Sequence, residues 1–203
     1  MRAIQGSFFN EPGFNELAGF SYRPELLDQA EEEALLTHVR NLPFREFEFH
    51  GYTGKRRVVS FGWKYDFSGQ KLREAEAIPE FLAPLRTRAA SFARLEPEVF
   101  EQVLVTEYGP GAGIGWHRDK GVFGEVVGVS LLASCILRFR RKVEQKWERV
   151  NVLAKQRSAY HLAGPARSEW QHSILRVDAL RYSITFRTLA LAENQPQLTQ
   201  LKN

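Results

Sequence analysis

The chain has 203 residues, of which 43% are hydrophobic and 12% aromatic, and its formal net charge is +4 with an isoelectric point near 9.3. This composition predicts one globular domain with a substantial core and excludes an intrinsically disordered chain. The single cysteine, Cys135, excludes an intramolecular disulfide and a thiolate zinc cluster, which favours a cytoplasmic protein. No apolar run approaches the roughly 20 residues that span a bilayer, and the first residues lack a signal-peptide pattern, so we expect neither export nor membrane insertion.

The first hundred residues contain helical and hairpin patterns. Residues 1–22 have no clear period and are expected to form an extended arm. Apolar residues recur at helical spacing over 24–39, and Pro43 ends that element. Residues 44–66 alternate around a glycine-containing loop at 51–54, which predicts a hairpin. A second helix is expected over 78–95.

From Phe100 onward the sequence consists of short β-prone runs. They lie at 100–108, 126–133, 135–141, 147–153, 157–162, 171–176 and 180–189. Several short strands at close spacing indicate a sandwich or barrel, and we expect a jelly roll in a mainly β (α+β) protein. The expected organisation is an arm and helix over 1–43, a hairpin with its supporting helix over 44–99, a β core over 100–189 and a polar tail over 190–203.

Three residues have the chemistry of a metal site. His117 and Asp119 are two apart, so in a strand both side chains would face one ion. His172, on a later strand, is the natural third ligand. Two imidazoles and one carboxylate leave coordination positions open, which is typical of non-haem Fe(II) oxygenases. The same ligands alone could also hold the zinc ion of a hydrolase.

The segment 181–187 predicts an anion clamp beside that metal. Arg181, Ser183, Thr185 and Arg187 occupy alternate positions, so one face of the strand is polar and the other is apolar. One guanidinium could bind a distant carboxylate through paired hydrogen bonds while the other lies nearer the metal. A dicarboxylate cosubstrate fits this arrangement, whereas a hydrolase has no use for the paired arginines.

Residues 44–189 resemble the AlkB family of Fe(II)- and 2-oxoglutarate-dependent dioxygenases. The resemblance rests on 108–119 (YGPGAGIGWHRD), 164–172 (GPARSEWQH) and 181–187 (RYSITFR). It implies a double-stranded β-helix, Fe(II) bound by the three ligands above, and 2-oxoglutarate and O2 as cosubstrates. It further implies that Arg181 binds the far carboxylate of 2-oxoglutarate, that Tyr108 and Ser183 add hydrogen bonds, and that Arg187 lies near the metal, the cosubstrate and the substrate.

The resemblance also implies that the hairpin in 44–66 is a nucleotide-recognition lid. The residues expected to contact substrate are the aromatics that could stack on an unpaired base and the polar residues near the turn, namely His50, Tyr52, Arg56, Arg57, Phe61 and Trp63. With Tyr65, the last two are expected to share one strand face. A base attacked in its ring must be flipped out or single-stranded, so a stacking platform beside the iron makes chemical sense.

The sequence departs from the family pattern at several positions. Thr106 stands where an asparagine is frequent and can still hydrogen-bond the cosubstrate, and Ser183 also replaces an asparagine. Gly121 replaces an acidic residue that contacts the base in some members, which leaves the base preference open.

The expected function is oxidative dealkylation of N-alkylated nucleobases, as repair of alkylated DNA by a monomer acting on single-stranded or flipped-base DNA. The alternatives are a related oxygenase acting on RNA or protein, and a non-catalytic nucleic-acid-binding jelly roll.

Overall fold

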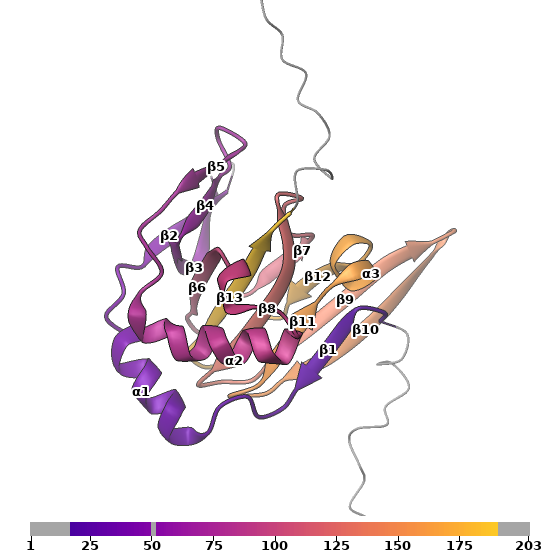
Figure 1. Cartoon of the computed structure of the whole chain (residues 1–203). Coiled ribbons are helices and arrows are strands. Elements are labelled where there is room, and N and C mark those ends of the chain that lie inside the picture. The colour runs from indigo at the N-terminus through magenta and orange to yellow at the C-terminus, as the bar shows by residue number, and fades with distance from the viewer. Residues whose placement is uncertain (1–16, 50–51, 191–203) are drawn as a thin grey trace, which may run out of the picture.

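Two antiparallel sheets face each other, and helices cover the outer side of the larger one (Figure 1). The computed structural model of the chain describes residues 17–49 and 52–190. The larger sheet has the order β1-β11-β8-β13-β6-β3-β2. Its strands are β1 (Phe20–Arg23), β2 (Arg45–Phe49), β3 (Tyr52–Phe61), β6 (Gln102–Tyr108), β8 (Phe123–Leu131), β11 (Ala159–Leu162) and β13 (Arg181–Leu189).

The smaller sheet has the order β10-β9-β12-β7. Its strands are β7 (Ile114–His117), β9 (Cys135–Val143), β10 (Lys146–Ala154) and β12 (Gln171–Ile174). A separate hairpin pairs β4 (Trp63–Asp66) with β5 (Lys71–Glu74). The helices are α1 (Gln29–Val39), α2 (Ala83–Ala93) and the short α3 (Gly164–Ser168), with 3-10 turns at Glu80–Leu82 and Pro97–Val99. The predicted jelly roll is confirmed.

The alternation within β13 separates two cores. Tyr182, Ile184 and Phe186 belong to the cluster that packs against α1 and α2. A second cluster, which includes Tyr108 and Phe139, fills the space between the two sheets. Arg181 and Arg187 lie on the strand face opposite the helix-packed side chains and are also buried, so the polar face of β13 is interior.

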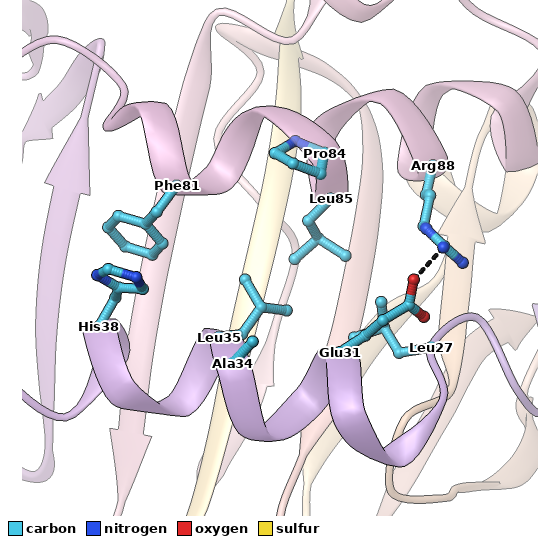
Figure 2. A pocket seen from close by; sticks show the side chains of 9 residues that line it. All are labelled: Leu27, Glu31, Ala34, Leu35, His38, Phe81, Pro84, Leu85 and Arg88. Carbon is cyan, nitrogen blue, oxygen red and sulfur yellow. Dashed lines mark hydrogen bonds and ion pairs between the residues drawn. The ribbon is translucent and has the colours of Figure 1, made fainter.

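Helix α1 begins with a capping box formed by Asp28 and Glu31. The Asp28 carboxylate accepts a hydrogen bond from the Glu31 amide, and the Glu31 carboxylate accepts one from the Asp28 amide, which fixes the start of α1. A cleft separates α1 from α2, bridged by the Glu31–Arg88 ion pair and by His38 stacked on Phe81 (Figure 2). These helices pack on the apolar face of β13, so this cleft is remote from the polar face.

The predicted elements were largely confirmed, with local differences. The arm expected over 1–22 ends in strand β1, while residues 1–16 lie outside the described residues. The expected hairpin loop at 51–54 is shorter, because β3 already begins at Tyr52. β3 pairs with β6, so the hairpin extends the larger sheet. Within the described residues, the helices are too short to cross a membrane.

Candidate metal centre and carboxylate clamp

His117, Asp119 and His172 come together between the sheets. Each offers a ligand atom, and these atoms all lie within 4.8 Å of one another. The two histidines are direct cross-strand partners in the β7–β12 pairing, which brings residues far apart in sequence to one point. The His172 Nε2 to Asp119 Oδ2 distance is 3.9 Å. The predicted ligand set is therefore assembled by the fold.

Asp119 reaches this point differently from the expectation. β7 ends at His117, so Asp119 lies beyond the strand and simple alternation does not position it. Instead, Arg187 Nη2 donates a hydrogen bond to Asp119 Oδ1 at 3.3 Å, and Arg187 Nη1 donates one to Gln102 Oε1 at 3.0 Å. Arg187 thus couples β13 and β6 to the carboxylate ligand.

The protonation states suit a divalent cation. Burial lowers the pKa of His172 to about 4 and also lowers the pKa of His117, although Asp119 opposes both shifts. Burial alone raises the pKa of Asp119, but Arg187 and the two imidazoles outweigh it and hold that pKa below its usual range. At neutral pH the three groups are thus a carboxylate and two neutral imidazoles, the forms that bind metals.

A backbone contact selects the metal-binding nitrogen of His117. Its Nδ1 lies 2.9 Å from the Gly115 carbonyl oxygen, which can only accept a hydrogen bond. Nδ1 is therefore protonated and Nε2 has the free lone pair. The set of two imidazoles and one carboxylate fits Fe(II) with positions left open for other ligands.

Arg181 is buried with much of its hydrogen-bonding capacity unused. Its side chain is 0% exposed, and its Nε donates to Ser130 Oγ at 2.9 Å. Among the described residues, neither Nη1 nor Nη2 has a hydrogen-bond partner. An unpaired buried guanidinium is unfavourable, and a carboxylate matches its paired donors. The arrangement fits a dicarboxylate whose far end meets Arg181.

Residues on the neighbouring strands surround this guanidinium. Tyr108 is opposite Arg181 in the β6–β13 register, with its ring centroid 4.9 Å from the Arg181 Cζ. Thr106 and Ser183 are also opposite each other and are both buried. Burial raises the pKa of Tyr108, so the phenol remains a hydrogen-bond donor at neutral pH. The predicted cosubstrate residues thus share one buried region, and their roles toward the cosubstrate remain predictions.

Tyr160 is a further polar residue of this region that the sequence did not single out. It is buried in β11 opposite Gly128 of β8, whose missing side chain leaves room for the phenol ring. Burial raises its pKa, with Tyr108 and Arg181 close enough to influence it. The sequence feature that identifies Tyr160 is a tyrosine opposite a glycine on the neighbouring strand. This feature can be recognised only once the two strands are known to be paired.

The lid residues divide between the two faces of β3. Arg56 lies 3.8 Å from the centroid of the Phe47 ring, and burial lowers its pKa, opposed by Tyr108. Arg56 lies opposite Tyr108 in the β3–β6 register, and its charge contributes to lowering the pKa of His117. Arg57 instead forms an ion pair with Glu107, which also accepts a hydrogen bond from Tyr182 on the helix side. Arg57 therefore points away from the interior, contrary to its predicted role.

The expectation that Phe61, Trp63 and Tyr65 share one strand face was wrong. Gly62 has φ +71°, and a Cβ there would lie 2.0 Å from the Glu101 carbonyl oxygen, so the chain turns at this glycine. Phe61 is 3% exposed in the helix-side core and is not free to stack on a base.

The remaining lid predictions have separate outcomes. Trp63 is half-buried in β4. His50 and the side chain of Tyr52 lie outside the described residues. The Lys120 ammonium, in the loop after Asp119, lies 5.1 Å from the ring centroid of Tyr65. The β4–β5 hairpin therefore contacts the loop that carries the carboxylate ligand.

Comparisons with known proteins agree with this geometry. The model of the 2OG-Fe(II) oxygenase superfamily matches residues 19–187. A similar protein is the probable RNA/DNA demethylase ALKBH6 of Danio rerio, 29% identical over 125 residues. That alignment covers 61% of this chain and 51% of ALKBH6, so the chain matches about half the length of this relative. The solved structure of OsALKBH1 superposes with a TM-score of 0.64 at 16% identity, over 84% of this chain and 98% of that one, which shows a shared fold.

We expect the His172 imidazole of the metal-free protein to titrate near pH 4, well below its ordinary value of 6.5. Between these values the unfolded chain binds a proton that the folded chain excludes, so the free energy of unfolding falls as the pH is lowered. Ring-carbon NMR, with His172→Gln for assignment, measures the titration. A midpoint near 6.5 would contradict the burial of this ligand.

Proposed function

The chain belongs to the 2OG-Fe(II) oxygenase superfamily, and we propose that its substrate is an N-alkylated base in single-stranded or flipped-base DNA. The similarity to ALKBH6 supports the resemblance to the AlkB family, and the superfamily implies a dioxygenase that uses Fe(II), 2-oxoglutarate and O2. The observation that carries the cosubstrate assignment is Arg181, buried with two unpaired nitrogens on the strand that also holds Arg187. Membership of the superfamily does not specify the substrate, so the assignment of a nucleobase needs support of its own.

Arg56 and Phe47 support the choice of a base as substrate. The guanidinium is stacked on the ring, and Arg56 lies opposite Tyr108 in the β3–β6 register, so this planar cation is next to the predicted cosubstrate residues. Such planar cations stack on unpaired bases and favour nearby phosphates. The similar protein ALKBH6 is a probable RNA/DNA demethylase, and RNA is therefore the second candidate substrate.

The reaction divides between the bound groups and the protein. When bound, Fe(II) supplies the oxidising chemistry that couples O2 and the conversion of 2-oxoglutarate to succinate and CO2 to hydroxylation of the alkyl carbon. The hydroxyalkyl group then leaves the base nitrogen as an aldehyde, which is formaldehyde for a methyl group. His117, Asp119 and His172 would hold the metal, and Arg181, held by its hydrogen bond to Ser130, would orient the cosubstrate by its far carboxylate.

Arg187 has a positioning role in this scheme. By donating to Asp119 and to Gln102 it fixes the orientation of the carboxylate ligand. Loss of a residue that hydrogen-bonds a metal ligand typically lowers metal affinity or activity. Arg187 and Asp119 are each 11% exposed at their side chains, and their interaction is stronger in this partly buried setting than it would be in water.

We further propose that the protein is a monomer that repairs alkylated DNA in the cytoplasm. The single cysteine is buried, in keeping with a protein that does not depend on disulfides.

The direct test supplies Fe(II), 2-oxoglutarate and a single-stranded oligonucleotide carrying one methylated base, and measures succinate and formaldehyde. We expect equal amounts of both products.

His117→Ala should lower turnover by more than roughly 100-fold, because a lost metal ligand costs at least as much as a lost supporting contact. Undiminished turnover by His117→Ala would overturn the metal assignment. Turnover on methylated RNA or a methylated peptide but not on DNA would reassign the substrate.

Arg56 and Arg57 form a matched pair, since they are adjacent in β3 and lie on opposite faces. We expect Arg56→Ala to lower kcat/KM for the methylated oligonucleotide by about tenfold, which is within the range for the loss of one stacking contact to a base. Arg57→Ala removes an exposed ion pair and should leave kcat/KM nearly unchanged. Equal losses in both variants would contradict the assigned orientation of β3.

A further inference from the structure

The outer face of the smaller sheet is rich in arginine, lysine and tryptophan. Register aligns Arg140 with Arg149 and Lys142 with Trp147 across the β9–β10 pair. The side chains that alternate with the core residues of these strands point outward. The cationic and indole side chains among them, together with Trp116 of β7, form what we call the outer basic face: Trp116, Arg138, Arg140, Lys142, Trp147 and Arg149.

Stacking holds the arginines of this face in place. The Arg140 Cζ lies 4.4 Å from the ring centroids of both Trp116 and Trp147, and the Arg138 Cζ lies 4.8 Å from that of Trp116. Arg140 Nε donates to Gln171 Oε1 at 2.8 Å, and Arg138 Nε donates to Ser173 Oγ at 3.0 Å. Because each Nε is occupied, the terminal nitrogens are the donors left for a ligand, and they are already ordered.

The charges of the outer basic face are not neutralised. Among the described residues, its arginines and lysine form no ion pair, whereas Arg141, on the opposite face, pairs with both Glu148 and Glu169. Like charges directly opposite on paired strands are unfavourable, yet Arg140 faces Arg149. The stacking on Trp116 and Trp147 holds Arg140 in place but leaves its charge unpaired, and a polyanion bound to the face would relieve the repulsion.

The face lies directly behind the metal centre. Trp116 precedes the ligand His117 in β7, and Gln171 precedes the ligand His172 in β12, so strand alternation puts each neighbour on the opposite side of the sheet from its ligand. β7 is the edge strand of the smaller sheet. A chain leaving the metal centre past β7 would therefore reach the outer basic face at Trp116.

We propose that the outer basic face binds the sugar-phosphate backbone of single-stranded nucleic acid flanking the reacting nucleotide, with Trp147 stacking on an unpaired base. This inference rests on the proposed function for the identity of the polyanion. Rows of cations interleaved with aromatic rings suit a single strand, because cations meet phosphates while rings stack on bases of any sequence. Trp147 is 40% exposed and is also stacked against Arg140, so it offers exposed ring surface to a base at an ordered position.

The test compares two double variants that each remove two exposed positive charges. Lys142→Gln/Arg149→Gln alters the outer basic face without disturbing the stacked arginines. Arg40→Gln/Arg94→Gln alters the caps of α1 and α2 in the helix layer and controls for net charge. Fluorescence anisotropy measures the Kd of each full-length protein for a labelled, unmethylated oligothymidylate over a series of salt concentrations.

We expect Lys142→Gln/Arg149→Gln to weaken binding about tenfold and to reduce the salt slope by about 1.4, which is roughly 0.7 for each of two lost phosphate contacts. Trp147→Ala should weaken binding about tenfold without changing the slope, because stacking releases no counterions. The helix-layer variant should bind like the wild type. Equal binding by both double variants would overturn the proposal, as would binding to vesicles of anionic phospholipid but not to the oligonucleotide.

A second readout separates this inference from the proposed function. We expect Lys142→Gln/Arg149→Gln to demethylate a methylated trinucleotide as fast as the wild type, and to lose about tenfold in kcat/KM only on a long oligonucleotide. Equal kcat/KM of variant and wild type on the long substrate would overturn the outer basic face alone. If the wild type demethylates no nucleic acid of either length, the proposed function fails, while the anisotropy data still decide whether the face binds a single strand.

Discussion

The burial of Arg181 within the central strand β13 is the constraint on which the site depends. β13 pairs with β6 on one side and β8 on the other, so its backbone is fixed along its length. Its apolar face packs under the helices, which forces the polar face, with both arginines, into the space between the sheets. A buried cation without a complete set of acceptors is costly, and a bound carboxylate offsets that cost. The fold therefore favours the binding of an anionic cosubstrate at Arg181.

The metal centre depends on the same strand from its other end. Arg187 reaches the carboxylate of Asp119, while the two histidines are brought together by the β7–β12 pairing in the opposite sheet. The site therefore exists only where the two sheets face each other. A metal at the three ligands and a carboxylate at Arg181 would together join the two sheets. We therefore expect binding of the metal and the cosubstrate to stabilise the packing of one sheet against the other.

The sequence predicts a site residue well where its residue type and its spacing along the chain both point to the same role. It predicts less well where the position of a residue depends on which strands pair. The strand 181–187 and the three ligands could be predicted because residue types and spacing specify them. The loop position of Asp119 and the turn at Gly62, which separates Phe61 from Trp63, depend on contacts with distant segments. The opposite orientations of Arg56 and Arg57 could not be read from a run of basic residues, because they follow from the register of β3 against β6. The outer basic face emerges only from the β9–β10 and β9–β12 registers.

Recognition of the far carboxylate of 2-oxoglutarate by Arg181 can be measured directly. Calorimetric titration of the Mn(II)-loaded protein with 2-oxoglutarate and with 2-oxobutyrate, which lacks that carboxylate, isolates the interaction when repeated with Arg181→Met. The wild type should prefer 2-oxoglutarate by about 10- to 100-fold, the range expected for a charge-assisted hydrogen-bonded pair, and Arg181→Met should bind both compounds with similar affinity. An undiminished preference for 2-oxoglutarate in Arg181→Met would contradict the account.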